Sequence, residues 1–345
     1  MKKVGILVLA LLMVLSLLTA CGGGGETADP TTPPSQGEVS PSDNVDTPPS
    51  NGEETDYSTM KIGVVMKSFD EFQQAVMDGA KDMAAEYGIP EENVMTLAPA
   101  TETDVMQQVE MIEDCISQGV KILLVSPNQP DTVMNALSSA VSKGIMVVTV
   151  DTDAPDFADK VTYIGTDNEA AAYEGALAFS DMIPEGSNVI ILRGKLGDPN
   201  HEARTKGLTD ALEEKGHTVL TAEDANCETD KATNVTENLL TKYGSDGIDA
   251  VMVTSDSMAL GAVTALKQAN IADKVAVCGF DGFQAAIEGV RDGDILMIIA
   301  QKPYFIGQKG IECGIGALEG KTYDAYINSG IAIIGQENFE DFLNS

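Results

Sequence analysis

Residues 61–88, KIGVVMKSFDEFQQAVMDGAKDMAAEYG, contain one complete unit of a pattern that is repeated through most of this chain. The short apolar run KIGVVM favours a buried β-strand. After a polar loop, apolar residues recur at helical spacing, from Phe72 through Val76 to Met83. Gly88 ends the pattern and is typical of a helix C-cap. The stretch therefore predicts one strand followed by one helix.

The same alternation continues along the chain. Continuous apolar strands that alternate with helices indicate parallel sheets with helices on both faces. Because residues 60–345 are more than one core usually spans, we expect an α/β fold with two doubly wound parallel-sheet domains. Further strands are expected at 122–126, 146–150, 188–192, 250–254 and 274–279. Helices are expected at 72–87, 103–118, 132–143, 169–182, 202–214, 231–243 and 257–268.

Polar side chains follow most of these strands. Ligands of parallel α/β sheets bind beyond the carboxyl ends of the strands, so these residues are candidates for one site. Carboxylates, amides and guanidinium groups make paired hydrogen bonds to neighbouring hydroxyls, and an aromatic ring covers the apolar side of a sugar. The predicted ligand-binding set is Lys67, Asp70, Phe72, Asp151, Asp153, Asp198, Asn200, Arg204, Ser255, Asp281 and Gln301.

Each of these residues also has a simpler interpretation. Asp, Asn and Ser are favoured at helix N-caps, and for Asp256 and Asn168 we expect capping. Phe72 has two possible roles, because its helical spacing to Val76 allows a core position, whereas its place at a strand exit favours stacking on a ligand. The recurrence of such residues in both halves favours a carbohydrate site over isolated caps.

Several segments together resemble the sugar-binding proteins of bacterial ABC transporters, in the ribose and galactose/glucose branch. They include VVMKSFDEF at 64–72, GDPNHEARTKGL at 197–208, VCGFDG at 277–282 and IIAQKP at 298–303. The resemblance implies a type I periplasmic binding protein with two lobes, a three-strand hinge and closure on a monosaccharide. The implied lobes are 60–164 plus 302–328 and 165–301 plus 329–345, with crossovers near Gly165, after Gln301 and near Asn328.

The resemblance also implies roles for single residues. Asp70 would hydrogen-bond the sugar, Phe72 would stack on it, and Arg204 would clamp ring hydroxyls. Asp198 and Asn200 would lie nearby, and Asp151, Asp281 and Gln301 match further polar positions. The chain departs from the family pattern at Ser255, at Thr152 and at Asn226–Cys227, where a second aromatic is expected, and its calcium loop is missing. These departures leave the particular sugar open.

The N-terminus predicts export. Lys2 and Lys3 precede an apolar run, and LTAC at 18–21 resembles a bacterial lipobox. We therefore expect a signal peptide at 1–20 and lipidation of Cys21, which would anchor the protein at the extracytoplasmic face of the cell membrane. The acidic segment 21–59 has too few apolar residues to fold and is predicted to be a disordered linker.

The charge and the cysteine spacing argue against several classes of function. With 21 basic and 54 acidic residues, the formal charge of −33 argues against nucleic acid as a partner. The widely spaced Cys115, Cys227, Cys278 and Cys313 form no metal motif, and we predict no cofactor, no metal and no enzymatic activity. The expected partners are a monosaccharide and the permease subunits of an ABC transporter, and the protein is expected to be a monomer.

The sequence also allows functions other than transport. A chemoreceptor or sensor kinase could use the same binding domain, and the ligand could be a small polar molecule other than a sugar. A repressor would need an N-terminal DNA-binding helix-turn-helix, which the sequence does not indicate. Asp151, Asp153 and Asp198 could in principle serve a glycosidase, although nothing else in the sequence supports catalysis.

Overall fold

The computed structural model describes residues 55–101 and 103–343, which contain two six-stranded sheets. The predictions for residues 1–54, including the signal peptide, Cys21 and most of the linker, lie outside the described residues. The first sheet has the order β11-β5-β4-β3-β1-β2, and all its pairs are parallel. Its strands are β1 (Ile62–Val65), β2 (Val94–Leu97), β3 (Ile122–Val125), β4 (Met146–Val150), β5 (Tyr163–Gly165) and β11 (Tyr326–Asn328).

The second sheet has the order β12-β10-β9-β8-β6-β7. Its pairs are parallel except for β10 with β12, which is antiparallel. This sheet therefore has the doubly wound topology in which the carboxyl ends of five neighbouring strands meet at one edge. Its strands are β6 (Asn188–Arg193), β7 (Thr218–Asp224), β8 (Ala250–Val253), β9 (Ala276–Asp281), β10 (Met297–Ala300) and β12 (Ala332–Ile334).

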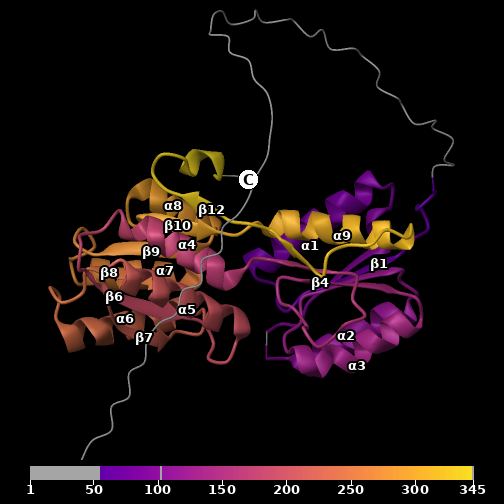
Figure 1. Ribbon diagram of the computed structural model, residues 1–345, viewed down its shortest axis with the longest axis horizontal. Coiled ribbons are helices and arrows are strands. Elements are labelled where there is room, and N and C mark those ends of the chain that lie inside the picture. Colours follow the sequence, from indigo (N-terminus) through magenta and orange to yellow (C-terminus); the bar gives the residue numbers. More distant parts are fainter. Residues whose placement is uncertain (1–54, 102, 344–345) are drawn as a thin grey trace, which may run out of the picture. The chain divides into compact units, whose positions relative to one another are not determined.

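Helices cover both faces of the first sheet (Figure 1). On one face lie α1 (Glu71–Glu86) and α9 (Pro303–Leu318), and on the other lie α2 (Val105–Ser117) and α3 (Pro130–Ser142). Each face has its own apolar core, because successive strand residues point to opposite sides. Figure 1 shows α1 beside α9 although they are far apart in sequence. We call this sheet and its helices the first lobe.

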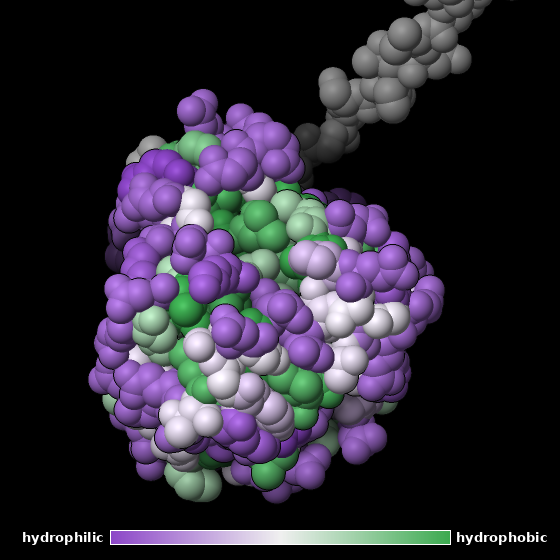
Figure 2. Space-filling view, turned by 90° about the vertical axis from the view of Figure 1, so that its left-hand side faces the viewer, coloured by the Kyte–Doolittle hydropathy of each residue, from purple (hydrophilic) through white to green (hydrophobic). Residues whose placement is uncertain are grey.

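The second sheet is covered in the same way. Helices α4 (Asn168–Ser180) and α5 (Pro199–Glu214) pack on one face, and α6 (Thr229–Tyr243), α7 (Asp256–Gln268) and α8 (Gln284–Asp292) pack on the other. We call this sheet and its helices the second lobe. The face shown in Figure 2 is mostly hydrophilic, with smaller hydrophobic areas between polar residues. Among the described residues, no helix is both long and apolar enough to cross a membrane.

The chain passes between the two sheets three times. It leaves the first sheet after β5, returns between β10 and α9, and leaves again between β11 and β12. The predicted fold of two doubly wound α/β domains is confirmed. The six strands named from the sequence are present with ends shifted by at most two residues. Two short 3-10 turns, Glu91–Asn93 and Phe339–Asp341, complete the described structure.

Candidate functional site

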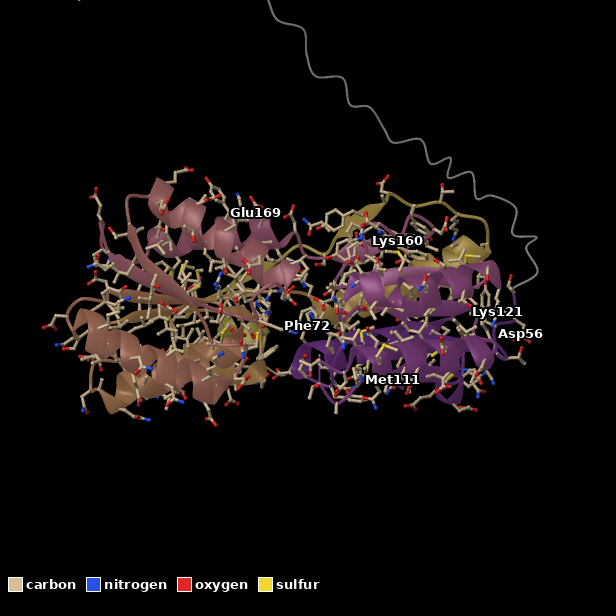
Figure 3. All side chains as sticks on the ribbon, turned by 90° about the horizontal axis from the view of Figure 1, so that it is seen from below. Asp56, Phe72, Met111, Lys121, Lys160 and Glu169 are labelled. Carbon is tan, nitrogen blue, oxygen red and sulfur yellow. The ribbon has the colours of Figure 1, made fainter. Side chains whose placement is uncertain are left out.

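A cavity of about 430 Å³ lies at the carboxyl ends of the strands of both lobes. The residues that line it lie at or just after the ends of β1, β2 and β4 in the first lobe and of β6, β7, β8, β9 and β10 in the second, or in the first two turns of the helices that follow. Figure 3 shows Phe72 at the boundary between the two lobes. The cavity is lined by Lys67, Ser68, Asp70, Phe72, Gln73, Thr101, Thr103, Asp151, Lys195, Asn200, His201, Arg204, Asn226, Cys227, Glu228, Ser255, Ser257, Asp281, Phe283 and Gln301.

Asp151 is the most constrained residue of the first lobe. It directly follows β4 with a positive φ of 60°, which is uncommon for a residue with a side chain. Its Oδ2 accepts from Gln73 Nε2 at 2.9 Å and Ser126 Oγ at 3.0 Å, and lies 3.2 Å from Lys67 Nζ. Because these contacts fall on Oδ2 and only 4% of the residue is exposed, Oδ1 is a rigidly placed acceptor.

Arg204 has the corresponding place in the second lobe. Its Nε donates to Asn168 Oδ1 at 2.7 Å, and its Nη1 donates to Thr254 O at 2.8 Å. The guanidinium lies 4.1 Å from the centre of the Phe280 ring. These contacts fix the plane of a residue that is 4% exposed and that lines the cavity. A fixed guanidinium plane suits two neighbouring hydroxyl oxygens.

Asp281 links Arg204 to the end of β10. Its Oδ1 accepts from Arg204 Nη1 at 2.9 Å and from Gln301 Nε2 at 2.7 Å. Burial raises the pKa of Asp281, although Arg204, Ser255 and Gln301 all oppose the rise. Its φ of 122° is outside the usual range for a residue with a side chain. Asp281 is therefore held in place for hydrogen bonding by its neighbours.

Asp256 and Asn168 are not the helix caps that the sequence predicted. Asp167 caps α4, and Asn168 uses its Oδ1 for Arg204. Asp256 is the first residue of α7, and its Oδ2 accepts from the backbone of Gly282 and Phe283, both at 2.7 Å. Burial, with the negative charge of Asp281, raises the pKa of Asp256 well above its ordinary value. Tertiary hydrogen bonds outcompete local capping at both positions.

The start of α5 brings polar groups to the cavity. Asp198 is its N-cap and accepts from the backbone of Asn200 at 2.9 Å and of His201 at 3.1 Å. Burial would raise the pKa of Asp198, but the positive charge of Lys67 and hydrogen bonding to His201 outweigh it, so the pKa is lowered. Asn200 reaches the first lobe, where its Nδ2 donates to Thr152 Oγ1 at 3.3 Å.

His201 lines the cavity as a neutral ring. Burial, followed by the positive charge of Arg204, lowers its pKa to about 3. Its Nδ1 is 2.9 Å from Thr254 Oγ1, and its Nε2 is 3.2 Å from Cys227 Sγ. Where the resemblance in the sequence implied a second aromatic, the cavity is therefore lined by the thiol of Cys227 and the imidazole of His201.

Phe72 has both of the positions that the sequence allowed for it, one in the apolar core and one at the cavity. It is only 6% exposed and packs in the apolar core under α1, and it also lines the cavity. Asp70 caps the same helix by accepting from Gln73 N at 2.9 Å, and its side chain borders the cavity as well. Core packing thus holds the face of Phe72 that does not meet the cavity.

Nine of the eleven predicted residues line this cavity. Asp198 instead caps α5, and Asp153 lines a second cavity of about 360 Å³ and pairs with Lys160 at 3.0 Å. The three carboxylates considered for a glycosidase, Asp151, Asp153 and Asp198, are thus divided among different environments. Among the described residues, no group of His, Cys, Asp and Glu has the arrangement of a metal site.

Gln73 lines the cavity but is not among the residues that were predicted from the sequence. It is 1% exposed, it orients Asp151, and its Oε1 is buried with no partner among the described residues. The sequence does contain a pattern that could have identified Gln73. It lies on the same face of α1 as Met77, Ala80 and Ala84, where an apolar residue is expected. A polar residue on a buried stripe needs a polar partner.

The fold is that of a two-lobed binding protein with a candidate ligand site in the cavity between the lobes, and comparison with known proteins agrees with this fold. Residues 62–322 match the periplasmic binding protein domain. The ribose import binding protein of Haemophilus influenzae is 31% identical over 265 residues, which cover 77% of this chain and 87% of that protein. The D-allose-binding periplasmic protein of Escherichia coli is 28% identical, over 76% of this chain and 85% of that protein.

A solved structure shows the same architecture. The periplasmic solute binding protein of an ABC transporter from Actinobacillus succinogenes, with bound D-allose, has a TM-score of 0.76 and 29% identity, covering 82% of this chain and 99% of that one. The chain therefore belongs to the periplasmic binding protein family, and the resemblance seen in the sequence is confirmed. The two relatives and the solved structure described above are named for ribose or D-allose.

Proposed function

We propose that this protein captures a monosaccharide between its two lobes and delivers it to the permease of an ABC transporter. The observation that carries the proposal is the pair of clusters in the cavity, Lys67–Asp151 from the first lobe and Arg204–Asp281 from the second. Relatives named for ribose and D-allose support a sugar as the ligand.

The charges of these clusters favour a neutral ligand rich in hydroxyl groups. Each inner carboxylate is paired with a cation, at 3.2 Å for Asp151 and 2.9 Å for Asp281. A ligand therefore needs no net charge, but it must both donate to carboxylate oxygens and accept from guanidinium and amide nitrogens. Sugar hydroxyls do both. Phe72 supplies an apolar surface for the C–H side of the ring.

Capture follows from the division of the site between two lobes. A sugar that contacts both clusters binds the closed arrangement better than the open one, and it shifts the population toward closure. A micromolar dissociation constant corresponds to about −8 kcal/mol. A few charge-assisted hydrogen bonds and one stacked ring supply free energy of this order after the loss of motional freedom. No step of this mechanism changes the sugar, so the protein is proposed to be a carrier and not an enzyme.

A thermal-shift screen tests the proposal. The protein from residue 22 onward is unfolded and refolded to remove any retained ligand, and is then heated with aldoses including ribose and allose, with polyols and with nucleosides. We expect a small group of monosaccharides to raise the melting temperature, and chromatography should recover the sugar unchanged. Hydrolysis of glycosides, or no shift with any sugar, would contradict the assignment. A strong shift with nucleosides alone would indicate another small polar ligand.

Anchoring at the cell membrane through Cys21 is part of the proposal. Its support is the sequence LTAC, since the position lies outside the described residues. In cells that express the full chain, wild-type protein should fractionate with membranes and incorporate a radiolabelled fatty acid. Cys21→Ser should lose the label and become soluble or remain uncleaved, whereas Cys115→Ser, at a buried thiol, serves as the control. Unchanged membrane recovery and label in Cys21→Ser would remove the anchor from the account.

A further inference from the structure

The loop between β9 and α8 is held by carboxylates from both lobes. Three consecutive backbone N–H groups, two in the loop and one in the first residue of α8, donate to side chains: those of Gly282 and Phe283 to Asp256 Oδ2, and that of Gln284 to Glu71 Oε1 at 2.6 Å. Asp256 belongs to the second lobe, as the loop does. Glu71 is the first residue of α1 in the first lobe, so its bond crosses between the lobes.

This loop positions two residues that line the cavity, Asp281 and Phe283. Asp281 directly precedes it, and the unusual φ of 122° at Asp281 must be imposed by surrounding contacts. Phe283 lines the cavity and packs against the apolar cores of both lobes. Glu71 itself is exposed and is not among the residues that line the cavity. It therefore acts on the site through the loop and not through the ligand.

We propose that Glu71 is a positioning residue that fastens the second lobe to the first on closure and so slows the release of a ligand that it does not touch. The proposal rests on the proposed function for the identity of the ligand. A carboxylate is stabilised at a helix N-terminus, and Gln284 is the first residue of α8. Because the bond joins the two lobes, it stabilises the closed form and is lost in the open one.

The kinetic consequence is specific. A sugar enters the open form, in which the bond between Glu71 and Gln284 is not made, so the association rate should not change when Glu71 is replaced. Release requires opening, so the dissociation rate should rise. Loss of a helix-capping side chain changes an equilibrium by about 2- to 30-fold, and we expect a factor in that range in both the dissociation rate and the dissociation constant.

The experiment compares Glu71→Gln, which keeps an oxygen acceptor, with Glu71→Ala, which removes it. Glu86→Gln is the matched control, since it removes the same charge from an exposed position at the other end of α1. With the best sugar from the thermal-shift screen, dissociation should quicken in the order wild type, Glu71→Gln, Glu71→Ala. The control should follow the wild type, and the association rate should be the same for all four proteins.

A second measurement separates failure of this proposal from failure of the sugar assignment. Amide hydrogen exchange in the peptide that spans residues 282–287 is followed without ligand and with whichever compound of the screen binds best, whether or not it is a sugar. The ligand should slow exchange of this peptide in the wild type and in Glu86→Gln, and should slow it less in Glu71→Ala. Equal ligand-induced protection in all proteins would overturn the role of Glu71 even if the ligand is not a sugar. If a sugar binds and its dissociation rate is unchanged by Glu71→Ala, the proposal also fails, while the proposed function stands.

Discussion

Arg204 donates from Nη1 to Asp281 Oδ1 at 2.9 Å, and both residues are more than nine-tenths buried. The pair joins α5 to the end of β9, and it therefore depends on two segments that are far apart in sequence. Each partner lowers the cost of burying the other's charge. Both residues line the cavity, which makes the pair the centre of the second lobe's half of the candidate site.

Arg204→Lys should weaken sugar binding by about 1.5–3 kcal/mol, because an ammonium group cannot reproduce the fork that meets Asp281, Asn168 and two hydroxyls together. Calorimetric titration measures the change. Arg193→Lys is the control, since Arg193 forms an ion pair with Asp224 at 2.6 Å and does not line the cavity. Wild-type affinity in Arg204→Lys would exclude Arg204 from the site.

Phe72→Ala should affect both folding and binding, because the ring packs in a core and also lines the cavity. Truncation of a buried phenylalanine costs roughly 3–5 kcal/mol of unfolding free energy. The sugar-induced rise in melting temperature should also shrink, since the stacking surface is lost. Phe69→Ala is the control, because Phe69 is 59% exposed. A destabilised Phe72→Ala that keeps the full ligand-induced shift would show that the ring serves the core alone.

Asp256→Asn should change how stability depends on pH. The pKa of Asp256 is raised in the folded protein, so its contribution is present below the ordinary pKa of about 3.9 and is lost as pH rises through the raised value. Urea unfolding at several pH values above 4 should therefore show Asp256→Asn gaining stability relative to the wild type as pH rises. Asp230→Asn, at an exposed position in the first turn of α6, should show no such trend. Parallel curves for Asp256→Asn and the wild type would contradict the raised pKa.

His201→Gln tests a shift of opposite sign. The pKa of His201 is lowered to about 3, so the stability that it contributes is present above about 6.5 and is lost as pH falls toward 3. The wild type should lose unfolding free energy more steeply than His201→Gln over this range. His217 is kept in both proteins. An NMR titration of the two histidines provides a direct check, and a His201 ring that titrates near 6.5 would refute the neutral, buried assignment.

The sequence predicted the fold well because strand and helix periodicity are local properties. The first unit, with Phe72 and Val76 on one side of a helix, could be recognised without any tertiary information. The short strands β5, β11 and β12 could not be recognised as easily, since three residues carry too little periodicity and their pairing is set by the passage between lobes.

The site was predicted less completely for a physical reason. Asp151 directly follows a recognisable strand and Arg204 lies near the start of a recognisable helix, so both could be chosen by position. Asn168 and Asp256 have the residue types and positions of helix caps, and only the folded chain shows that Arg204 and the loop after Asp281 use their side chains instead. The hydrogen-bond partners of Asn168 and Asp256 lie in segments that are distant in sequence, and no local sequence pattern indicates these partners.

The central claim is that the cavity between Asp151 and Asp281 binds one monosaccharide. Calorimetric titration of the refolded, ligand-free protein with the best sugar from the screen tests it most directly, with Asp281→Asn measured in parallel. We expect one sugar per protein with a micromolar or lower dissociation constant, about −8 kcal/mol or stronger, and a loss of affinity in Asp281→Asn. No heat of binding in a correctly folded wild type, or equal affinity in Asp281→Asn, would contradict the claim.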